Sequence, residues 1–402
     1  MSVSKTPPQQ PGLLWRTAST FVMAATGMLA RAFLYGLNDV EVVGLDRFLA
    51  LLDTRKDVDS RQRGLITVSN HVSVLDDPLI WGVLPFRYAI NHQNLRWSLG
   101  SHDICYKNSL AGHFFCAGQT LPTHRLRHSP WGGLYQPTIN QAIRLLSHPP
   151  PPAPKERLDA PPVLSSSASP SQSPSSVPPS LSLSDSDAPP LSVFASSFPR
   201  NLYYSTNNVD RWPAPSVYAS NRFAWVHIFP EGLVHQQRDR SLRYFKWGVA
   251  RLILESEPAP DIVPMFIDGP DRIMPEDRTF LRFFPRVGQS IRIVLGDVLD
   301  PAAFADLRAR WKLLVLQSRG RADSIDNGTT GGHKQPDLWY GLEAQQLRIE
   351  ASQRIRNEIL KLRRRFGYPE EDPALALAES WAEEPNKRRY RSRVDNSIVY
   401  QD

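Results

Sequence analysis

Four short apolar runs, each ending in a polar turn and separated from the next by a helical pattern, most constrain how this chain can fold. β-branched or aromatic residues dominate the runs, and Gly, Pro or Asp bounds them, as is typical of buried strands. Their alternation with helical patterns predicts an α/β fold with a mostly parallel or mixed central sheet flanked by helices. The candidate strands are Leu65–Ser69, Ala224–Phe229, Ile262–Ile267 and Ile291–Leu295, and the candidate helices are Leu79–Val83, Tyr135–Leu146 and Trp247–Glu255.

Two stretches without this periodicity divide the predicted domain. Residues 149–200 consist largely of Pro and Ser, and such a segment cannot bury enough apolar surface to offset its chain entropy. We therefore expect a disordered insertion there, and a shorter flexible insertion at 319–337, where Gly, Asp, Thr and Asn cluster. The remaining predicted parts are a domain in two pieces (39–148 and 201–318), a C-terminal amphipathic helix (338–368) and a basic flexible tail (369–402).

Residues 1–38 contain basic side chains but no acidic one. Between Arg16 and Arg31 lie about fourteen uncharged residues, fewer than the roughly 20 that a membrane-spanning helix needs. Three interpretations stay open: a helix that enters one membrane leaflet, a cleaved mitochondrial transit peptide, and a helix packed on the domain. We expect the first, a membrane anchor or targeting segment with Trp15, Phe33 and Tyr35 near the interface.

The net charge of +7 is compatible with nucleic acid, anionic lipid or a phosphorylated substrate as partner. No nucleic-acid-binding motif accompanies the charge, so we expect no nucleic-acid partner. Part of the charge lies at the end of the predicted helix 342–366, where it suits either the helix dipole or contact with anionic lipid. Cys105 and Cys116 are too few for a disulfide scaffold or a Cys-based metal site, and we expect neither a metal nor a cofactor.

A histidine and an aspartate directly follow the first candidate strand. His71 lies on the expected strand-to-helix turn, and Asp76 comes five residues later at the start of the helix. A carboxylate bonded to one imidazole nitrogen leaves the other free to take a proton from a hydroxyl. This pair needs no serine or cysteine if the substrate brings the nucleophile. Since chance supplies about one His-x4-Asp in a chain with ten histidines, the position at a strand end carries the argument.

A second polar turn follows the candidate strand 224–229. Pro230 ends the hydrogen bonding of the strand and Gly232 permits a positive φ, so Glu231 is held at the C-terminal edge. Ligands bind at this edge of open α/β sheets, and His71 is expected at the same edge. A solvated turn carboxylate is the ordinary explanation for Glu231 alone. Together, the two turns predict a catalytic site.

His-x4-Asp followed by Phe-Pro-Glu-Gly resembles the signature pair of the glycerolipid acyltransferases, and the chain is similar to the tafazzin family among them. Further blocks resemble that family in the same order, so that the likeness covers most of residues 13–300 apart from the Pro/Ser segment. These blocks are Asn70–Gly82, Arg96–Cys105, His113–Phe115, Trp225–Gly232, Phe245–Gly248 and Phe284–Gln289.

The resemblance implies a glycerol-3-phosphate acyltransferase-like fold and a transacylase that needs no coenzyme A. Such an enzyme moves an acyl chain from a phospholipid such as phosphatidylcholine to a lysophospholipid, and it remodels cardiolipin. The resemblance also implies a monotopic protein of the mitochondrial inner and outer membranes that faces the intermembrane space. In this reaction His71 would deprotonate the lysolipid hydroxyl, and Asp76 would orient His71.

The same resemblance assigns substrate-binding residues. Gly118 and Arg125 occupy the block that binds phosphate in the superfamily, and Arg125 suits a bidentate grip on a phosphodiester, although a surface arginine is equally compatible. Lys246 is a weaker candidate for the same task. Glu231, with Gly232, either binds the glycerol or headgroup or only holds its turn.

Acyl-CoA-dependent members typically continue Phe-Pro-Glu-Gly with Thr-Arg-Ser, whereas this chain continues with Leu233-Val234-His235. The missing arginine is consistent with exchange between lipids. Two rival functions stay open: an acyl-CoA-dependent lysophospholipid acyltransferase, and a catalytically marginal membrane-surface protein that binds anionic lipid through its basic tail and N-terminal anchor. Protein partners are not encoded in any motif.

Overall fold

The computed structural model describes residues 10–126, 128–147, 202–276, 284–326, 336–381, 388–391 and 398–401. The Pro/Ser-rich segment 149–200 lies outside the described residues, as does most of the basic tail beyond residue 381.

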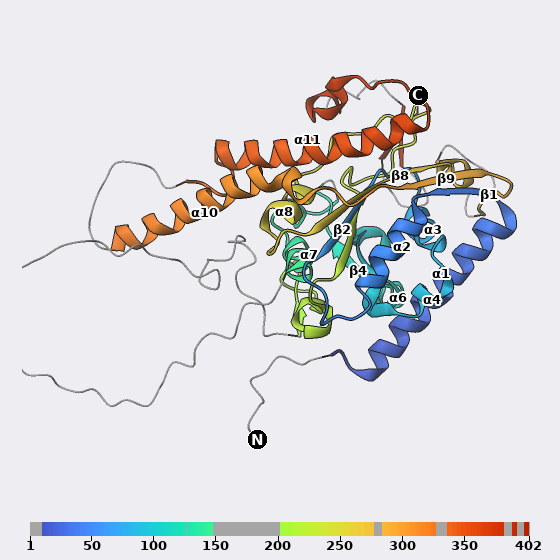
Figure 1. Ribbon diagram of the computed structural model, residues 1–402, viewed down its shortest axis with the longest axis horizontal. Helices are drawn as coiled ribbons and strands as arrows, with labels where there is room; N and C mark the ends of the chain where they lie inside the picture. Colours follow the sequence, from blue (N-terminus) through green and yellow to red (C-terminus); the bar gives the residue numbers. More distant parts are fainter. Residues whose placement is uncertain are drawn as a thin grey trace, which may run out of the picture.

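Within the described residues, a seven-stranded mixed sheet forms the centre of the fold (Figure 1). Five neighbouring strands run parallel, and the other two run in the opposite direction because β8 pairs antiparallel with β9. This confirms the predicted α/β class with a mixed, mostly parallel sheet. In spatial order the strands are β1 (Asp39–Val43), β9 (Ser290–Leu295), β8 (Asp261–Asp268), β2 (Leu65–Ser69), β7 (Trp225–Ile228), β3 (Arg96–Ser101) and β4 (Thr120–Thr123).

The four candidate strands are β2, β7, β8 and β9, with bounds that differ by at most one residue at either end. Sequence periodicity missed β1, β3 and β4. The first alternates acidic and apolar residues and is only partly buried, and β4 is a four-residue edge strand that contains Pro122. Acidic residues in β1 and a proline in β4 thus interrupt the apolar pattern by which buried strands are recognised.

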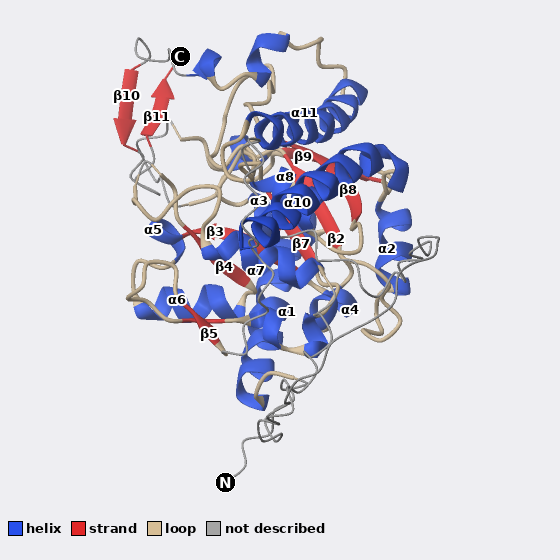
Figure 2. Cartoon of the chain, turned by 90° about the vertical axis from the view of Figure 1, so that its left-hand side faces the viewer, coloured by secondary structure: helices blue, strands red, loops and turns tan. Residues whose placement is uncertain are grey.

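Helices cover both faces of the sheet (Figures 1 and 2). The buried residues of β2 alternate between two hydrophobic clusters: Ile66 and Val68 belong to one, and Leu65 to the other. The first cluster packs against α7 (Pro137–Leu146), α8 (Gly248–Glu255), α10 (Ala305–Asp326) and α11 (Leu342–Arg365). The second packs against α1 (Leu13–Leu37), α2 (Leu45–Thr54), α3 (Asp76–Gly82) and α4 (Phe86–Ala89).

Short elements complete the described chain, and Figure 2 shows β10 and β11 as a sheet of their own. The remaining helices are α5 (His102–Cys105), α6 (Ser109–Ala117) and α9 (Pro270–Ile273), and the remaining strands are β5 (Tyr203–Tyr204), β6 (Trp212–Pro213), β10 (Arg388–Arg391) and β11 (Ile398–Gln401). The 3₁₀ turns are η1 (His92–Asn94), η2 (Pro215–Val217), η3 (Ala219–Asn221), η4 (Pro301–Phe304), η5 (Pro373–Ala376) and η6 (Glu379–Trp381).

Helix α10 continues to Asp326, eight residues into the segment 319–337 that we expected to be flexible. Residues 327–335 of that segment lie outside the described residues. The helix predicted at 342–366 is α11, which spans Leu342–Arg365.

The N-terminal helix α1 is 25 residues long, and it is the one helix in the described part of the chain that is long and apolar enough to cross a membrane. It packs along the domain: the Ser19 hydroxyl donates to the Ala117 carbonyl (2.8 Å), and Ala30 and Leu34 contact α3. At Gly82 of α3 an added Cβ would lie 2.8 Å from the Ala30 Cβ, so no larger residue fits. The structure thus shows α1 packed on the domain, and the anchor in one membrane leaflet stays our prediction.

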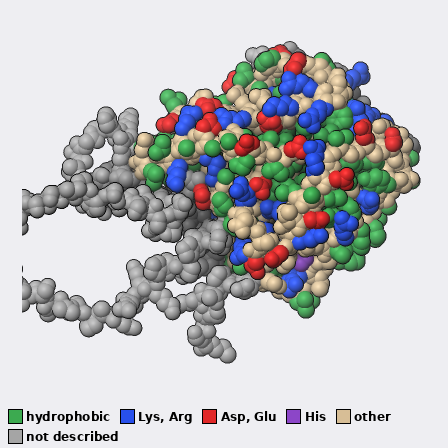
Figure 3. All heavy atoms as spheres, in the orientation of Figure 1, with side chains coloured by type: hydrophobic (Ala, Val, Ile, Leu, Met, Phe, Trp, Pro, Cys, Tyr) green, Lys and Arg blue, Asp and Glu red, His purple; other side chains and the backbone are tan. Residues whose placement is uncertain are grey.

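The opposite side of α1 is exposed and apolar. Figure 3 shows hydrophobic side chains at the lower right of the molecule, where α1 runs in Figure 1. The exposed large hydrophobic residues of this surface, which we call the α1 outer face, are Leu13, Leu14, Phe21, Met28, Leu29, Tyr35 and Leu37. Packing on one side and this much exposed apolar surface on the other are typical of a helix that binds a membrane or another apolar surface.

Candidate active site

His71 and Asp76 meet at the C-terminal edge of β2. The strand ends at Ser69, His71 lies on the connecting turn, and Asp76 is the first residue of α3. His71 Nδ1–H donates to Asp76 Oδ2 over 2.9 Å. Because a carboxylate only accepts, this bond assigns the proton to Nδ1 and leaves Nε2 as the basic nitrogen. Among the described residues Nε2 has no hydrogen-bond partner, so it is available to a substrate hydroxyl.

The carboxyl of Asp76 is fully buried and is held by three donors on one oxygen. Besides His71, the backbone N–H groups of Val72 (2.6 Å) and Ser73 (2.9 Å) donate to Oδ2. Burial raises the pKa of Asp76, and the bonds from His71, Ser73 and Val72 oppose this rise. The carboxyl therefore has a fixed position and accepts from the imidazole, as an orienting group requires.

Phe229 covers one face of the His71 ring. The two ring centroids are 4.3 Å apart with an interplanar angle of 21°, a stacked arrangement. The His71 side chain is 20% exposed, in contrast to the completely buried Asp76. The histidine is thus clamped between an aromatic ring and a carboxylate while it keeps access to the surface.

Glu231 holds the two polar turns together. Its Oε1 accepts from the backbone N–H of His71 (2.9 Å), and its Oε2 accepts from that of Arg243 (3.0 Å). Nearly complete burial raises the pKa of Glu231 to about 7, although both N–H donors and the charge of His71 oppose the rise. Of the two roles left open for Glu231, the contacts describe the one that holds the turn, because the carboxyl positions the backbone of His71; binding of the glycerol or headgroup stays a prediction.

Gly232 and Lys246 lie against each other beside this turn. Gly232 has a φ of +68°, and a Cβ there would come within 2.7 Å of the Lys246 Nζ. The Lys246 backbone N–H donates to the Pro230 carbonyl over 2.8 Å, and its side chain is exposed. Glycine is therefore required both by the backbone conformation and by the lysine that passes over it. A cationic group next to the catalytic turn is compatible with the predicted contact to a lipid phosphate.

Arg125 lies at the same sheet edge but not beside His71. It follows β4, three strands from β2, which places it about 14 Å along the sheet. Its guanidinium forms a fork with the carboxylate of Asp103, with Nε 3.2 Å from Oδ1. Although burial raises the pKa of Asp103, the bonds from Arg125 hold it below its ordinary value. The role of Arg125 in binding substrate stays a prediction, because in this structure its guanidinium is paired with the carboxylate of Asp103.

The sequence analysis did not predict a second set of polar and aromatic contacts next to His71 and Asp76. Asp77, next to Asp76, pairs with Arg96 of β3 and also accepts from the Trp81 indole (2.9 Å). His227 of β7 is completely buried, and burial lowers its pKa to about 3. Trp81 packs edge-on against His227, 4.9 Å between centroids. The signal available was the doubled acid in Asp76-Asp77, which suggests that each carboxyl has its own partner.

The loop that contains Arg243 is held by buried arginines of α11. Arg356 donates to the carbonyls of Arg243 (3.0 Å) and Leu242 (2.7 Å) and pairs with Glu371. Arg363 donates to the carbonyls of Arg240 (2.8 Å) and Asp239 (2.7 Å). The lipid contact that we considered for the basic end of α11 therefore does not describe Arg363, which is fully buried. These arginines fix the loop whose N–H binds Glu231.

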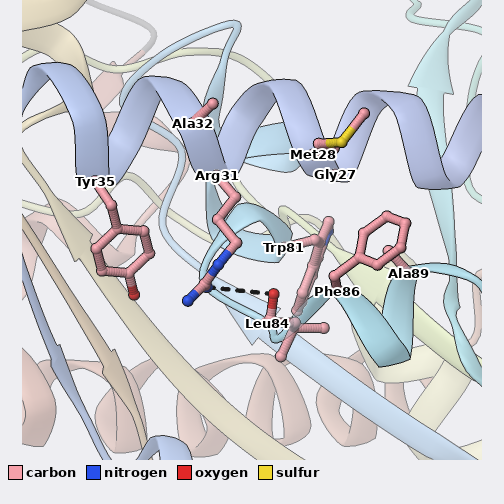
Figure 4. Close-up of a pocket in the computed structure, with 9 residues that line it drawn as sticks. All are labelled: Gly27, Met28, Arg31, Ala32, Tyr35, Trp81, Leu84, Phe86 and Ala89. Carbon is pink, nitrogen blue, oxygen red and sulfur yellow. Dashed lines mark hydrogen bonds between the residues drawn. The ribbon is translucent and has the colours of Figure 1, made fainter.

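An apolar cavity of about 380 Å³ lies between α1 and the α3–α4 segment (Figure 4). Met28, Trp81 and Phe86 are among its lining residues. Arg31 reaches from α1 to the other wall, where it donates to the carbonyls of Val83 (2.9 Å) and Leu84 (3.4 Å). The cavity thus adjoins α3, the helix that begins with Asp76.

Comparison with known proteins gives relatives along nearly the whole chain. Tafazzin of Saccharomyces cerevisiae is 30% identical over 394 residues, 96% of this chain and 88% of the yeast protein. Tafazzin of Drosophila melanogaster is 27% identical over 75% of this chain and 57% of its own length. N-acylphosphatidylethanolamine synthase of Arabidopsis thaliana is 26% identical over 74% of this chain and 75% of its own length.

Among solved structures, the 1-acyl-sn-glycerophosphate acyltransferase PlsC from Thermotoga maritima aligns with 79% of this chain and 83% of its own, at 14% identity and a TM-score of 0.37. No protein-family model matches the chain.

A His–Asp pair at the C-terminal edge of a mixed sheet, in a chain with these relatives, defines a phospholipid acyltransferase. The yeast relative narrows this class to one family. Because the yeast protein is 30% identical over almost the entire sequence, the chain belongs to the tafazzin family.

Proposed function

We propose that the chain is a phospholipid–lysophospholipid transacylase that works without coenzyme A. The observation that carries this proposal is the bond from His71 Nδ1 to Asp76, which leaves Nε2 as a base at a site that is open to the surface. A base in this state activates a hydroxyl group that the substrate itself brings.

In the proposed reaction, Nε2 of His71 takes the proton of the lysolipid hydroxyl while the hydroxyl oxygen attacks the ester carbonyl of the donor phospholipid. The tetrahedral intermediate then expels the glycerol oxygen of the donor, which takes the proton back from the imidazolium. Asp76 stabilises the imidazolium through its bond to Nδ1. One ester is formed and one is broken, so no other reactant is needed.

The proposed lipids are cardiolipin and its lyso form, with phosphatidylcholine as a donor. The chain lacks the arginine that typically follows Phe-Pro-Glu-Gly in acyl-CoA-dependent enzymes, and it has Leu233-Val234-His235 instead. Lys246 beside the catalytic turn and Arg125 at the far end of the same edge are the proposed contacts for phosphodiesters.

We further propose a monotopic attachment to mitochondrial membranes on the side that faces the intermembrane space. The α1 outer face supports a membrane contact, because it exposes large apolar side chains along the length of the helix. The cavity of Figure 4 supports it too, since apolar walls near α3 suit a hydrocarbon chain. The mitochondrial assignment follows from the family.

The test uses purified full-length protein and liposomes that contain labelled phosphatidylcholine and lysocardiolipin, with and without acyl-CoA. We expect acyl transfer without acyl-CoA, and a loss of about 10³-fold in His71→Ala. His113→Ala, at an exposed position of α6, is the matched control and should keep full activity. Transfer only with acyl-CoA would support the acyl-CoA-dependent rival, and lipid binding without transfer the non-catalytic one.

One further arm replaces lysocardiolipin with phosphatidylethanolamine, because a relative at 26% identity is named for N-acylation of that lipid. Acyl transfer to the amine in preference to the lysolipid hydroxyl would contradict the proposed acceptor while leaving the role of His71 intact.

A further inference from the structure

Two histidines and an aspartate converge beside the Asp103–Arg125 pair, apart from the catalytic residues. Strands β3 and β4 are parallel, with Ser101 opposite Thr123. The next residues, His102 and His124, continue this register and stack, with ring centroids 4.2 Å apart and planes at 20°. Asp210 comes from the loop between β5 and β6 and lies against both rings.

The ligand atoms of this cluster are already close together. One nitrogen from each histidine and one carboxylate oxygen all lie within 4.8 Å of one another. His102 Nε2 is 3.9 Å from Asp210 Oδ2. Two imidazoles with one carboxylate are a donor set that suits Zn²⁺ and similar transition ions, whereas Mg²⁺ and Ca²⁺ prefer oxygen ligands alone.

The aspartate is held in place as ligating carboxylates usually are. Its Oδ1 accepts from the Thr206 N–H (2.6 Å) and the Ser205 hydroxyl (2.8 Å), and its Oδ2 accepts from the Trp212 indole (2.6 Å). These bonds fix the position of the carboxyl, and an oriented carboxylate therefore faces two imidazoles.

The Thr206 hydroxyl now connects two of the three residues. It lies 2.7 Å from His124 Nε2 and donates to Asp210 Oδ2. A single rotation about the Thr206 Cα–Cβ bond would move this hydroxyl away from both atoms at once, while the Trp212 indole still orients Asp210 Oδ2. The ligand atoms, all within 4.8 Å of one another, would then need to close by no more than about 1.5 Å to reach the separations of a tetrahedral ion with bonds of about 2.0–2.1 Å.

We propose that His102, His124 and Asp210 bind a divalent transition ion of the Zn²⁺ class. The ion would join the β5–β6 loop to the ends of β3 and β4, next to Arg125, and its fourth ligand would be water or the displaced Thr206 hydroxyl. Our expectation of no metal rested on the scarcity of cysteine and does not bear on a site built from imidazole and carboxylate.

The test titrates Zn²⁺, and separately Co²⁺, into chelator-treated full-length protein, and it follows heat of binding, the visible absorption of tetrahedral Co²⁺ and Tm. We expect one ion per chain and a rise in Tm, with no rise from Mg²⁺. His102→Ala and Asp210→Asn should each weaken binding by about 100-fold or more. His113→Ala is the matched control, because it removes an exposed imidazole and should leave binding unchanged.

Thr206→Val separates the metal site from a metal-independent hydrogen-bond network. Valine keeps the shape but removes the hydroxyl that contacts His124 Nε2 and Asp210 Oδ2, so we expect Zn²⁺ to bind as tightly as to the unchanged chain or up to about tenfold more tightly. Failure of the unchanged chain to bind one ion would overturn the proposal. So would Zn²⁺ binding that His102→Ala leaves intact, or a Thr206→Val variant that binds as poorly as Asp210→Asn.

Discussion

The buried carboxyl of Glu231 should make the stability of the fold depend on pH across the neutral range. Its pKa is about 7 in the folded chain, against an ordinary value of 4.5. Between these values the folded chain keeps a proton that the unfolded chain has released. The resulting contribution to stability is complete below pH 4.5 and is lost as the pH rises through 7.

The size of the effect follows from the two pKa values. They differ by about 2.5, and at about 1.36 kcal/mol for each unit the full loss is about 3 kcal/mol. Between pH 5 and pH 8 the same relation gives about 2.5 kcal/mol. The amide in Glu231→Gln does not titrate. The free energy of unfolding of this variant should therefore lack the pH-dependent component, whatever constant difference the substitution itself causes.

The assay measures the free energy of unfolding of the unchanged chain and of Glu231→Gln at pH 5 and pH 8 in the same detergent. From pH 5 to pH 8 we expect the gap between them to move by about 2.5 kcal/mol in favour of the glutamine variant. Glu343→Gln, at an exposed position of α11, is the matched control for the substitution. A gap between Glu231→Gln and the unchanged chain that is equal at the two pH values would refute the reasoning.

Three further predictions concern named contacts. Asp76→Asn should lower the transfer rate by about 10³- to 10⁴-fold, because an amide fails to fix the His71 tautomer; near-normal rates in the liposome assay would exclude this role. Arg125→Ala should raise KM for phospholipid about tenfold while Asp103→Ala does not, and equal effects of both would mean that the pair is only structural. Arg356→Met should lower the free energy of unfolding, measured in urea, by about 3–5 kcal/mol, because it leaves the buried Glu371 carboxylate without its charged partner. A decrease of less than 1 kcal/mol would contradict this prediction.

The contact between His71 and Asp76 could be predicted because its geometry is local. His71 and Asp76 lie on one strand-to-helix turn, so five residues of sequence bring them into contact without reference to the rest of the fold. To predict that Glu231 lies near His71 needed one more inference, that the two strands before these residues end at the same edge of the sheet. That inference was correct because β2 and β7 are parallel neighbours, with Leu65 opposite Trp225.

Contacts that depend on strand order could not be predicted in this way. Arg125 meets Asp103 because β3 and β4 are adjacent and in register, and neither strand was identified from the sequence. The same register brings His102 beside His124. The polar residues of β3 and Pro122 in β4 weaken the apolar signal of these strands, so the residues that follow them could not be placed relative to one another.

The close contact between α1 and α3 limits how the chain can be matured. A protease that removed the first 38 residues would take away the wall that Gly82 is shaped to fit, and it would open the cavity that Trp81 lines. The catalytic helix would lose its support at the end opposite Asp76. Any processing of the N-terminus that preserves this contact must therefore leave Ala30 and Leu34 in place.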